Sequence, residues 1–209
     1  MQTGDAHGDP AGFLVTALIP VKSLIHGKSR LSGQLDLAHR IELTHDSLRR
    51  IVHTLQSTSG IGDIVIISRD AQVAAWAKRW RVEHMREHRR GLNAALREAR
   101  ARYAHASAVL VLPSDLAALS ITDVRGMLAA AQQAGERCVV IAPDRHGRGT
   151  NALLLKPPDA IDFDFGVNSA VRHAQRAIAH GIQPIWFRSD SICLDLDSPD
   201  DLNLYLEQW

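Results

Sequence analysis

Val109-Leu110-Val111-Leu112-Pro113-Ser114-Asp115-Leu116 is an unbroken aliphatic run that ends at a proline and is followed by one carboxylate. The run shows no alternation, which predicts a central strand with both faces covered by helices, as in the parallel sheets of α/β proteins. Pro113 has no backbone N–H and therefore ends the ladder. Asp115 then follows the carboxyl end of the strand, where open α/β sheets bind their ligands. An aspartate in a plain turn is the alternative interpretation.

The same pattern, an aliphatic run closed by a proline, recurs at residues 14–20 and 138–143. Amphipathic segments of helical period lie between such runs, so we predict an α/β fold. The 209 residues, 45% of them hydrophobic, can bury one large core. We therefore predict a single Rossmann-like domain over residues 13–209, with a mostly parallel central sheet and helices on both faces. Residues 1–12, rich in Gly and Asp, are predicted to be a flexible N-terminal tail.

Composition limits the class of protein. Twenty-four basic and 23 acidic side chains leave a net charge of +1, which argues against a nucleic-acid-binding protein held by a basic field. No apolar stretch approaches the length of about 18 residues that a membrane span needs, and no apolar signal-peptide core is present at the N-terminus. Cys138 and Cys193 both lie in apolar runs, so a cytoplasmic chain with buried free thiols is expected.

Three cations follow the first predicted strand, namely Lys22, Lys28 and Arg30. The triplet Gly27-Lys28-Ser29 resembles the end of a P-loop, but Lys22 stands where that motif needs a glycine, so a Walker ATPase is excluded. A basic loop at this place could clamp a nucleotide triphosphate with its Lys and Arg side chains. A solvated basic loop is the alternative. Gly91, which opens a predicted helix, permits close approach of a ligand but equally suits a plain turn.

Two further segments are candidates for binding an anion. The loop at residues 144–151 contains two glycines, which free its backbone to aim N–H groups at one anion while its arginines supply charge. Gly166 and Ser169 precede a helix predicted over residues 170–180, where the first unpaired helical N–H groups form an anion site. Ser169 as a mere N-cap is the alternative.

Acidic side chains recur near the C-terminus. Residues 192–199 are predicted to form a strand, on which Asp195 and Asp197 would project from the same face. Two like charges so placed repel one another unless a cation lies between them. A divalent metal shared with Asp115 would remove the repulsion.

The order of these motifs resembles that of a known family. The match runs from Leu18 onward and is specific only as a set. The motifs that carry it are Ile19-Pro20-Val21-Lys22, Lys28-Ser29-Arg30-Leu31, Gly91-Leu92-Asn93-Ala94-Ala95-Leu96, Pro113-Ser114-Asp115-Leu116, Ala142-Pro143-Asp144-Arg145, Gly149-Thr150-Asn151-Ala152-Leu153, Phe165-Gly166, Ser169 and Leu194-Asp195-Leu196-Asp197. They resemble the phospho-acid guanylyltransferases of coenzyme F420 biosynthesis, a branch of the molybdenum-cofactor guanylyltransferase-like nucleotidyltransferases. Val167-Asn168 and Ser114 depart from the pattern beside the acceptor site, which leaves the identity of the acid open.

The resemblance implies a nucleotidyltransferase fold and the transfer of GMP from GTP to the phosphate of a three-carbon phospho-acid, with release of pyrophosphate. It implies that Asp115, Asp195 and Asp197 hold Mg²⁺ and that Thr150, Gly166 and Ser169 bind the acceptor. With the resemblance we assign catalysis to Asp115, Lys28 and Lys22. The residues assigned to the nucleotide are Lys22, Lys28, Arg30, Gly91 and Asn93. No nucleic-acid or membrane partner is expected, and the chain could form a homodimer.

The chemistry expected from the residues agrees with this assignment. A phosphate acceptor is already an anion at neutral pH, so it needs neutralisation and alignment rather than a general base. The acid stays open among 2-phospho-L-lactate, phosphoenolpyruvate and 3-phospho-D-glycerate. A sugar-phosphate or molybdenum-cofactor nucleotidyltransferase is one alternative, although it would need a glycine-rich first loop. A non-catalytic nucleotide- or phosphate-sensing domain is the other.

Overall fold

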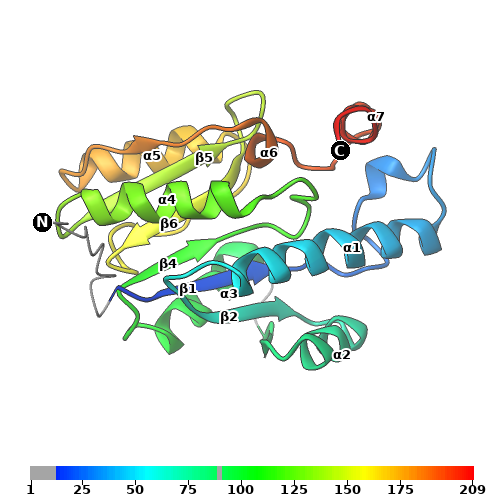
Figure 1. Ribbon diagram of the computed structural model, residues 1–209, viewed down its shortest axis with the longest axis horizontal. Helices are drawn as coiled ribbons and strands as arrows, with labels where there is room; N and C mark the ends of the chain where they lie inside the picture. Colours follow the sequence, from blue (N-terminus) through cyan, green and yellow to red (C-terminus); the bar gives the residue numbers. More distant parts are fainter. Residues whose placement is uncertain (1–12, 89–90) are drawn as a thin grey trace, which may run out of the picture.

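A computed structural model describes residues 13–88 and 91–209, and the predicted tail over residues 1–12 lies outside these ranges. Seven strands form one sheet (Figure 1). The strands are β1 (Val15–Pro20), β2 (Ile61–Ser68), β3 (Glu83–Arg86), β4 (Ala108–Val111), β5 (Cys138–Pro143), β6 (Thr150–Lys156) and β7 (Ile185–Trp186). The helices are η1 (Ser29–Leu31), α1 (Leu37–Gln56), α2 (Ala71–Trp80), α3 (Leu92–Arg102), α4 (Ile121–Gln133), α5 (Ser169–Ala179), α6 (Asp190–Cys193) and α7 (Pro199–Gln208).

The strand order is β3-β2-β1-β4-β6-β5-β7, with β1 and β4 near the centre. The pairs β1–β2, β1–β4, β2–β3 and β5–β7 are parallel, whereas β6 runs antiparallel to both β4 and β5. The link between β5 and β6 is too short for a crossover helix, so β6 must return antiparallel. The predicted α/β fold with a mostly parallel sheet is confirmed.

Both faces of the sheet are buried, as the central aliphatic run predicts. Along β4, Leu110 packs into the core beneath α1, α2 and α4, and Val109 and Val111 pack into the core beneath α3 and α5. All four residues of β4 have zero exposure. Figure 1 shows α1 and α4 in front of the sheet, and it shows β1, β2 and β4 running toward the end of the molecule where α7 lies. The two thiols are free, with Cys138 buried and Cys193 half-buried.

The start of α4 is fixed by Ser120. Ser120 caps the helix, and its hydroxyl accepts the backbone N–H of Asp123 at 3.2 Å. The Asp123 carboxylate accepts the backbone N–H of Ser120 at 2.8 Å, which completes a capping box. Both Ser and Thr can cap a helix, and here the acidic residue three positions on selects Ser120.

The strand predicted over residues 192–199 is wrong. The segment forms the short helix α6, capped by Ser189, and then an irregular stretch that joins α7. Ile192, Leu194 and Leu196 are buried, with 0 to 2% exposure, so the alternation along this segment is real. Alternation, however, reports only which side chains are buried and does not require a strand partner.

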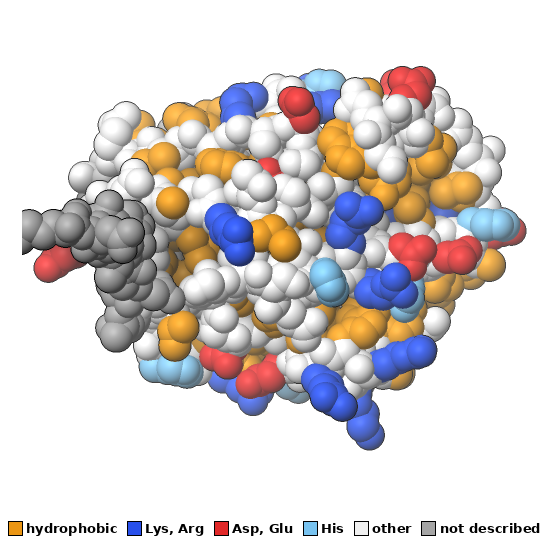
Figure 2. Space-filling model, in the orientation of Figure 1, with side chains coloured by type: hydrophobic (Ala, Val, Ile, Leu, Met, Phe, Trp, Pro, Cys, Tyr) orange, Lys and Arg blue, Asp and Glu red, His pale blue; other side chains and the backbone are white. Residues whose placement is uncertain are grey.

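Charged side chains are spread over the surface. On the face shown in Figure 2, Lys and Arg side chains are scattered, with acidic and uncharged side chains between them. This face therefore lacks the continuous basic patch that a nucleic-acid-binding surface uses. No helix in the described ranges is long and apolar enough to span a bilayer.

Candidate active site

A cleft of about 800 Å³ opens where β1 and β4 end, at Pro20 and Pro113. Every predicted site residue except Asn93 lines it. These residues are Lys22, Lys28, Arg30, Gly91, Asp115, Thr150, Gly166, Ser169, Asp195 and Asp197. The cleft therefore brings together segments from the start, middle and end of the chain, at the carboxyl edge of the parallel strands, where open α/β sheets bind ligands.

Two carboxylates in the cleft are in unfavourable surroundings. The Oδ1 atom of Asp115 is buried and has no hydrogen-bond partner. Burial and the neighbouring Asp115 carboxylate raise the pKa of Asp195 to about 6. Asn151 partly offsets this, because its amide nitrogen donates to Asp195 Oδ1 at 3.1 Å while also donating to the Ile192 carbonyl at 3.0 Å. Both carboxylates would be stabilised by a cation placed between them.

The third predicted carboxylate has a different partner. Asp197 Oδ2 forms an ion pair with Arg30 Nη1 at 2.7 Å, and both side chains are largely solvent-exposed. Among residues 13–88 and 91–209, no three His, Cys, Asp or Glu side chains are grouped so that they could hold a metal ion. Asp115 and Asp195 are thus electrostatic neighbours, whereas Asp197 joins the acidic segment to the basic loop.

Lys28 lies at the centre of the charged part of the cleft. Its ammonium donates to the Leu196 carbonyl at 2.9 Å. Burial lowers the pKa of Lys28, although the carboxylates of Asp115, Asp197 and Asp195 act in the opposite direction. The predicted basic loop is thus anchored at Lys28 and Arg30 to the acidic segment, while Lys22 is exposed at the edge of the cleft.

The opposite side of the cleft is formed by the start of β6 and of α5. Thr150 is buried, with 6% exposure, and Ser169 is the first residue of α5, with 2% exposure. Asn168 occupies the N-cap position in the left-handed region, and its side chain makes no capping hydrogen bond. Ser169 is therefore not the N-cap that the alternative interpretation supposed. The backbone N–H groups of Ser169 and Ala170 donate to the carbonyls of Gly166 and Arg148, at 3.1 and 3.0 Å, so two of the helical N–H groups that were expected to meet an anion are used within the protein.

Gly166 and Gly91 have backbone conformations that other residues rarely adopt. Gly166 has φ +137°, and a Cβ there would lie 3.1 Å from Arg172 Nη2. Gly91 has φ +105° but open space around the position of a Cβ. Its glycine is therefore required by the backbone conformation at the start of α3 rather than by a close neighbour.

Asn93, expected to bind the nucleotide, contacts the protein instead. Its amide nitrogen donates to the Phe165 carbonyl at 3.0 Å, and its Oδ1 accepts the Phe165 backbone N–H at 2.8 Å. Both halves of the amide are therefore used to hold the segment that precedes Gly166. Asn93 therefore supports, from α3, the side of the cleft lined by Phe165 and Gly166.

Sequence reasoning assigned no role to Asn151 or His173. Asn151 orients Asp195 and joins α6 to β6. His173 contacts Thr150 from α5 and has zero exposure. A signal for His173 is present in the sequence, because it lies on the buried face of α5 among alanines at positions 170, 174 and 177. A polar side chain on such a face needs a partner inside the protein.

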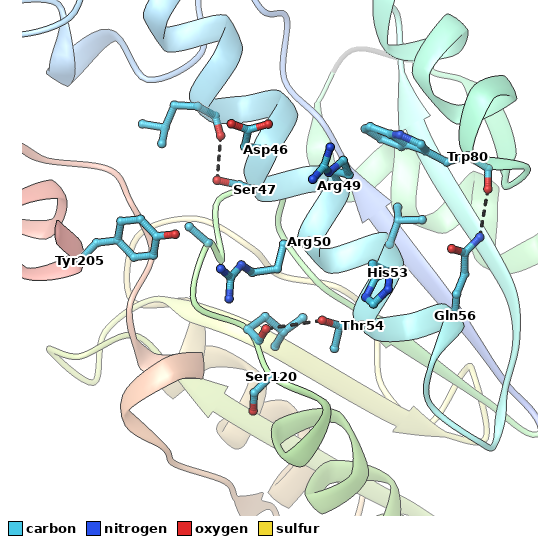
Figure 3. A pocket seen from close by; sticks show the side chains of 14 residues that line it. Asp46, Ser47, Arg49, Arg50, His53, Thr54, Gln56, Trp80, Ser120 and Tyr205 are labelled. Atoms are coloured by element: carbon cyan, nitrogen blue, oxygen red, sulfur yellow. Dashed lines mark hydrogen bonds between the residues drawn. The ribbon is translucent and has the colours of Figure 1, made fainter. Parts of the chain in front are cut away.

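A second cavity, of about 910 Å³, lies along α1 and reaches the end of α2 and Tyr205 of α7 (Figure 3). It is lined by exposed side chains such as Arg49, Arg50 and His53. None of the predicted site residues lines it. Volume alone would favour this groove, but the unpartnered carboxylate and the convergent charges lie in the cleft at the strand ends.

Comparison with known proteins shows the family of the chain. Residues 15–206 match the family model described as Guanylyl transferase CofC like. The chain belongs to this family of guanylyltransferases. A phosphoenolpyruvate guanylyltransferase of Rubrobacter xylanophilus is 41% identical over 191 residues, which cover 90% of this chain and 91% of that protein. A 2-phospho-L-lactate guanylyltransferase of Methanocaldococcus jannaschii is 29% identical, over 91% of this chain and 82% of that protein.

The fold agrees with the family. A nucleotidyl transferase of Methanothermobacter superimposes with a TM-score of 0.64, covering 94% of this chain and 97% of that one, at 15% identity. At this identity the likeness concerns the fold alone. The CofC-like enzyme described here thus has the Rossmann-like nucleotidyltransferase architecture that the sequence predicts.

Proposed function

We propose that this chain transfers the guanylyl group of GTP to the phosphate of a three-carbon phospho-acid and releases pyrophosphate. The observation that carries the proposal is the division of one cleft into a cationic side, at Lys22, Lys28 and Arg30, and an opposite side lined by Thr150, Gly166 and Ser169. The relatives named for phosphoenolpyruvate and 2-phospho-L-lactate support the class of acceptor. The product would serve coenzyme F420 biosynthesis.

The reaction needs two anions to approach each other. An oxygen of the acceptor phosphate attacks the α-phosphorus of GTP, the new P–O bond forms, and the bond to the β-phosphate oxygen breaks as pyrophosphate leaves. The acceptor oxygen is already deprotonated, so the task of the protein is alignment and neutralisation. Lys28 is placed to neutralise the triphosphate, and Thr150, Ser169 and the positive end of the α5 dipole are proposed to hold the acceptor anion.

A divalent cation fits the carboxylates of the cleft. Asp115 has a buried oxygen without a protein partner, and burial beside Asp115 raises the pKa of Asp195 to about 6, so both carboxylates would gain from a bound cation. Mg²⁺ accepts one or two carboxylates and completes its shell with phosphate oxygens and water. We propose that Asp115 and Asp195 hold it. Asp197, the third predicted ligand, is paired with Arg30 through its Oδ2 atom. The ion would supply charge neutralisation at the phosphates.

The proposed reaction can be tested directly. The protein is incubated with Mg²⁺, either GTP or ATP, and each of phosphoenolpyruvate, 2-phospho-L-lactate and 3-phospho-D-glycerate, and the products are identified by mass. A guanylylated acid and pyrophosphate are expected with GTP only. Sugar phosphates and molybdopterin serve as comparison acceptors, and turnover of these alone would contradict the proposal. Nucleotide binding without any pyrophosphate release would favour a sensing domain.

A chelator tests the metal separately. The same assay with excess EDTA should lose activity, and added Mg²⁺ should restore it. Full activity in the chelator would contradict the proposed role of Asp115 and Asp195.

A further inference from the structure

His173 is a fully buried polar residue that joins two segments of the acceptor side. Its Nδ1 lies 3.1 Å from Thr150 Oγ1, and its Nε2 lies 3.0 Å from the backbone nitrogen of Asp164. The imidazole has zero exposure, so water cannot replace either partner. Each ring nitrogen therefore has one protein partner.

The backbone of Asp164 decides the tautomer of His173. A backbone N–H can only donate, so Nε2 must be the acceptor and carry no proton. The ring is neutral near pH 7, because burial lowers the pKa of His173 to about 4, against the opposing effect of the Asp164 carboxylate. A neutral imidazole has one N–H, which must then be at Nδ1. Nδ1 consequently donates to the Thr150 hydroxyl oxygen.

Because Nδ1 of His173 donates, the Thr150 hydroxyl is the acceptor in this hydrogen bond. A hydroxyl has one proton to donate, and Thr150 does not donate it to His173. Thr150 lines the cleft, so its proton is available to an anion there. With the opposite tautomer, Thr150 would donate to His173 and would present only lone pairs to the same anion. We propose that His173 is a positioning residue that sets Thr150 as a hydrogen-bond donor to the anionic acceptor, an inference that rests on the proposed function.

The surroundings hold His173 in this arrangement. Its ring meets the Phe165 ring edge-on, with centroids 4.8 Å apart and planes at 71°. The Phe165 backbone is held by Asn93. The Asp164 carboxylate forms ion pairs with Arg176 at 2.7 Å and Arg172 at 3.2 Å, both on the same helix as His173. The donor to Nε2 is thereby fixed relative to the ring.

Two substitutions separate the two contacts of His173. The side-chain nitrogen of asparagine and Nδ1 of histidine are the same number of bonds from Cα. His173→Asn can therefore still donate a hydrogen bond to Thr150, but it has no acceptor for the backbone N–H of Asp164. The side-chain oxygen of glutamine and Nε2 of histidine are likewise the same number of bonds from Cα. His173→Gln therefore keeps an acceptor for the backbone N–H of Asp164 and loses the donor to Thr150. We expect His173→Gln to raise the acceptor KM about tenfold or more, since a hydrogen bond to a charged group is weakened. His173→Asn should stay much closer to wild type.

The readout that separates positioning from general damage is the split between kinetic constants. In His173→Gln, kcat and the KM for GTP should change by less than about twofold. This is a smaller change than the loss of one hydrogen bond to a charged group would cause. An unchanged acceptor KM in His173→Gln would overturn the proposal, and so would an equal loss in His173→Asn. Equal increases in the KM values of GTP and acceptor would indicate a structural role and would also overturn it.

A double-mutant cycle with Thr150→Val gives a second test. If His173 acts through the Thr150 hydroxyl, His173→Gln should add almost nothing to the acceptor KM once that hydroxyl is gone. Additive losses would contradict the proposal. Thr150→Ser, which keeps a hydroxyl, is the matched control and should remain sensitive to His173→Gln.

The wild-type protein provides a test that does not depend on how the variants fold. Nitrogen-15 NMR of the histidine rings distinguishes a protonated Nδ1 from a protonated Nε2. We expect Nδ1 of His173 to be protonated at pH 7, and a proton on Nε2 would refute the inference. Failure of the proposed function would look different, because wild-type protein would then make no guanylylated acid, whatever the tautomer.

Discussion

Lys28 combines an unusual backbone conformation with a charge placed among carboxylates. Its φ of 51° and ψ of 35° lie in the left-handed region, which costs a non-glycine residue about 1 kcal/mol or more. This conformation begins η1 and directs the ammonium to the Leu196 carbonyl. A sequence motif can identify such a lysine, but only the fold places it beside three aspartates.

We predict that Lys28→Ala reduces kcat/KM for GTP about tenfold or more, because a charged contact to the triphosphate is removed. The acceptor KM should change little. Steady-state kinetics with each substrate varied in turn measures this. Lys78→Ala, at an exposed position of α2, is the control and should behave as wild type. Unchanged GTP kinetics in Lys28→Ala would remove the basic loop from the active site.

Asp115 is the residue for which activity and stability should respond in opposite directions. Asp115→Asn should abolish turnover, because a proposed cation ligand is lost, while the melting temperature without metal stays equal or rises as repulsion with Asp195 is relieved. Thermal melts and pyrophosphate release measure the two effects. Asp46→Asn, on the exposed face of α1, should change neither. A folded Asp115→Asn protein with wild-type turnover would contradict the assigned role.

At the scale of elements, α6 and the segment after it hold the acidic residues without belonging to the sheet. Asp123 of α4 anchors this segment, because its carboxylate accepts hydrogen bonds from Ser189, and from Ser191 at 2.6 Å, in addition to its capping contacts with Ser120. Asp123 is buried, with 2% exposure. One buried carboxylate thus ties the start of α4 to the segment that carries Asp195.

We predict that Asp123→Ala lowers the free energy of unfolding by about 2 kcal/mol or more, because a helix cap is lost and the half-buried hydroxyls of Ser120, Ser189 and Ser191 lose their acceptor. Activity should also fall under conditions where the variant is still folded, since Asp195 is less well placed. Denaturant titration and kinetics below the transition measure both effects. Asp159→Asn, at an exposed position, is the control. A stability loss without any loss of activity would show that α6 is not needed to position Asp195.

At the scale of the whole molecule, His173 links the acceptor side to the pH dependence of folding. Its pKa is about 4 in the folded protein and 6.5 in its reference state. The unfolded chain therefore binds a proton that the folded protein excludes in this range, so stability falls as pH decreases from 6.5 to about 4. The full difference corresponds to roughly 3 kcal/mol.

We predict that the free energy of unfolding of His173→Gln falls less than that of the wild type as the pH decreases from 6.5 to about 4. Asp195, with a raised pKa of about 6, acts with the opposite sign in the same window, because its carboxyl is protonated more readily in the folded state. The comparison of wild type with His173→Gln isolates the histidine, since Asp195 is common to both. Urea unfolding between pH 4 and pH 7 measures the slopes, and identical slopes would contradict the pKa of His173.

The sequence by itself determined the elements that depend on local pattern. The aliphatic runs that end in proline predicted β1, β4 and β5, because an uninterrupted apolar run can be buried only between two helical layers. The sequence motifs also identified site residues that line the cleft, with Asn93 as the exception. The family motifs carried most of that site assignment, since no single segment would have shown the site.

The tertiary structure alone decided what depends on partners far along the chain. Alternating apolar residues in 192–199 suggested a strand. Hydrogen bonds to Asp123 of α4, and packing of Leu194 and Leu196 against Ala117, instead accompany the short helix α6 and an irregular segment. Asn93 became a support for Phe165 because both halves of its amide meet that backbone. The contacts of His173 were decided in the same way, since the partners of its two ring nitrogens, Thr150 and the backbone of Asp164, come from separate segments. Which member of a hydrogen bond donates depends on both partners. When the partners lie far apart in the chain, the pattern of one segment cannot show it.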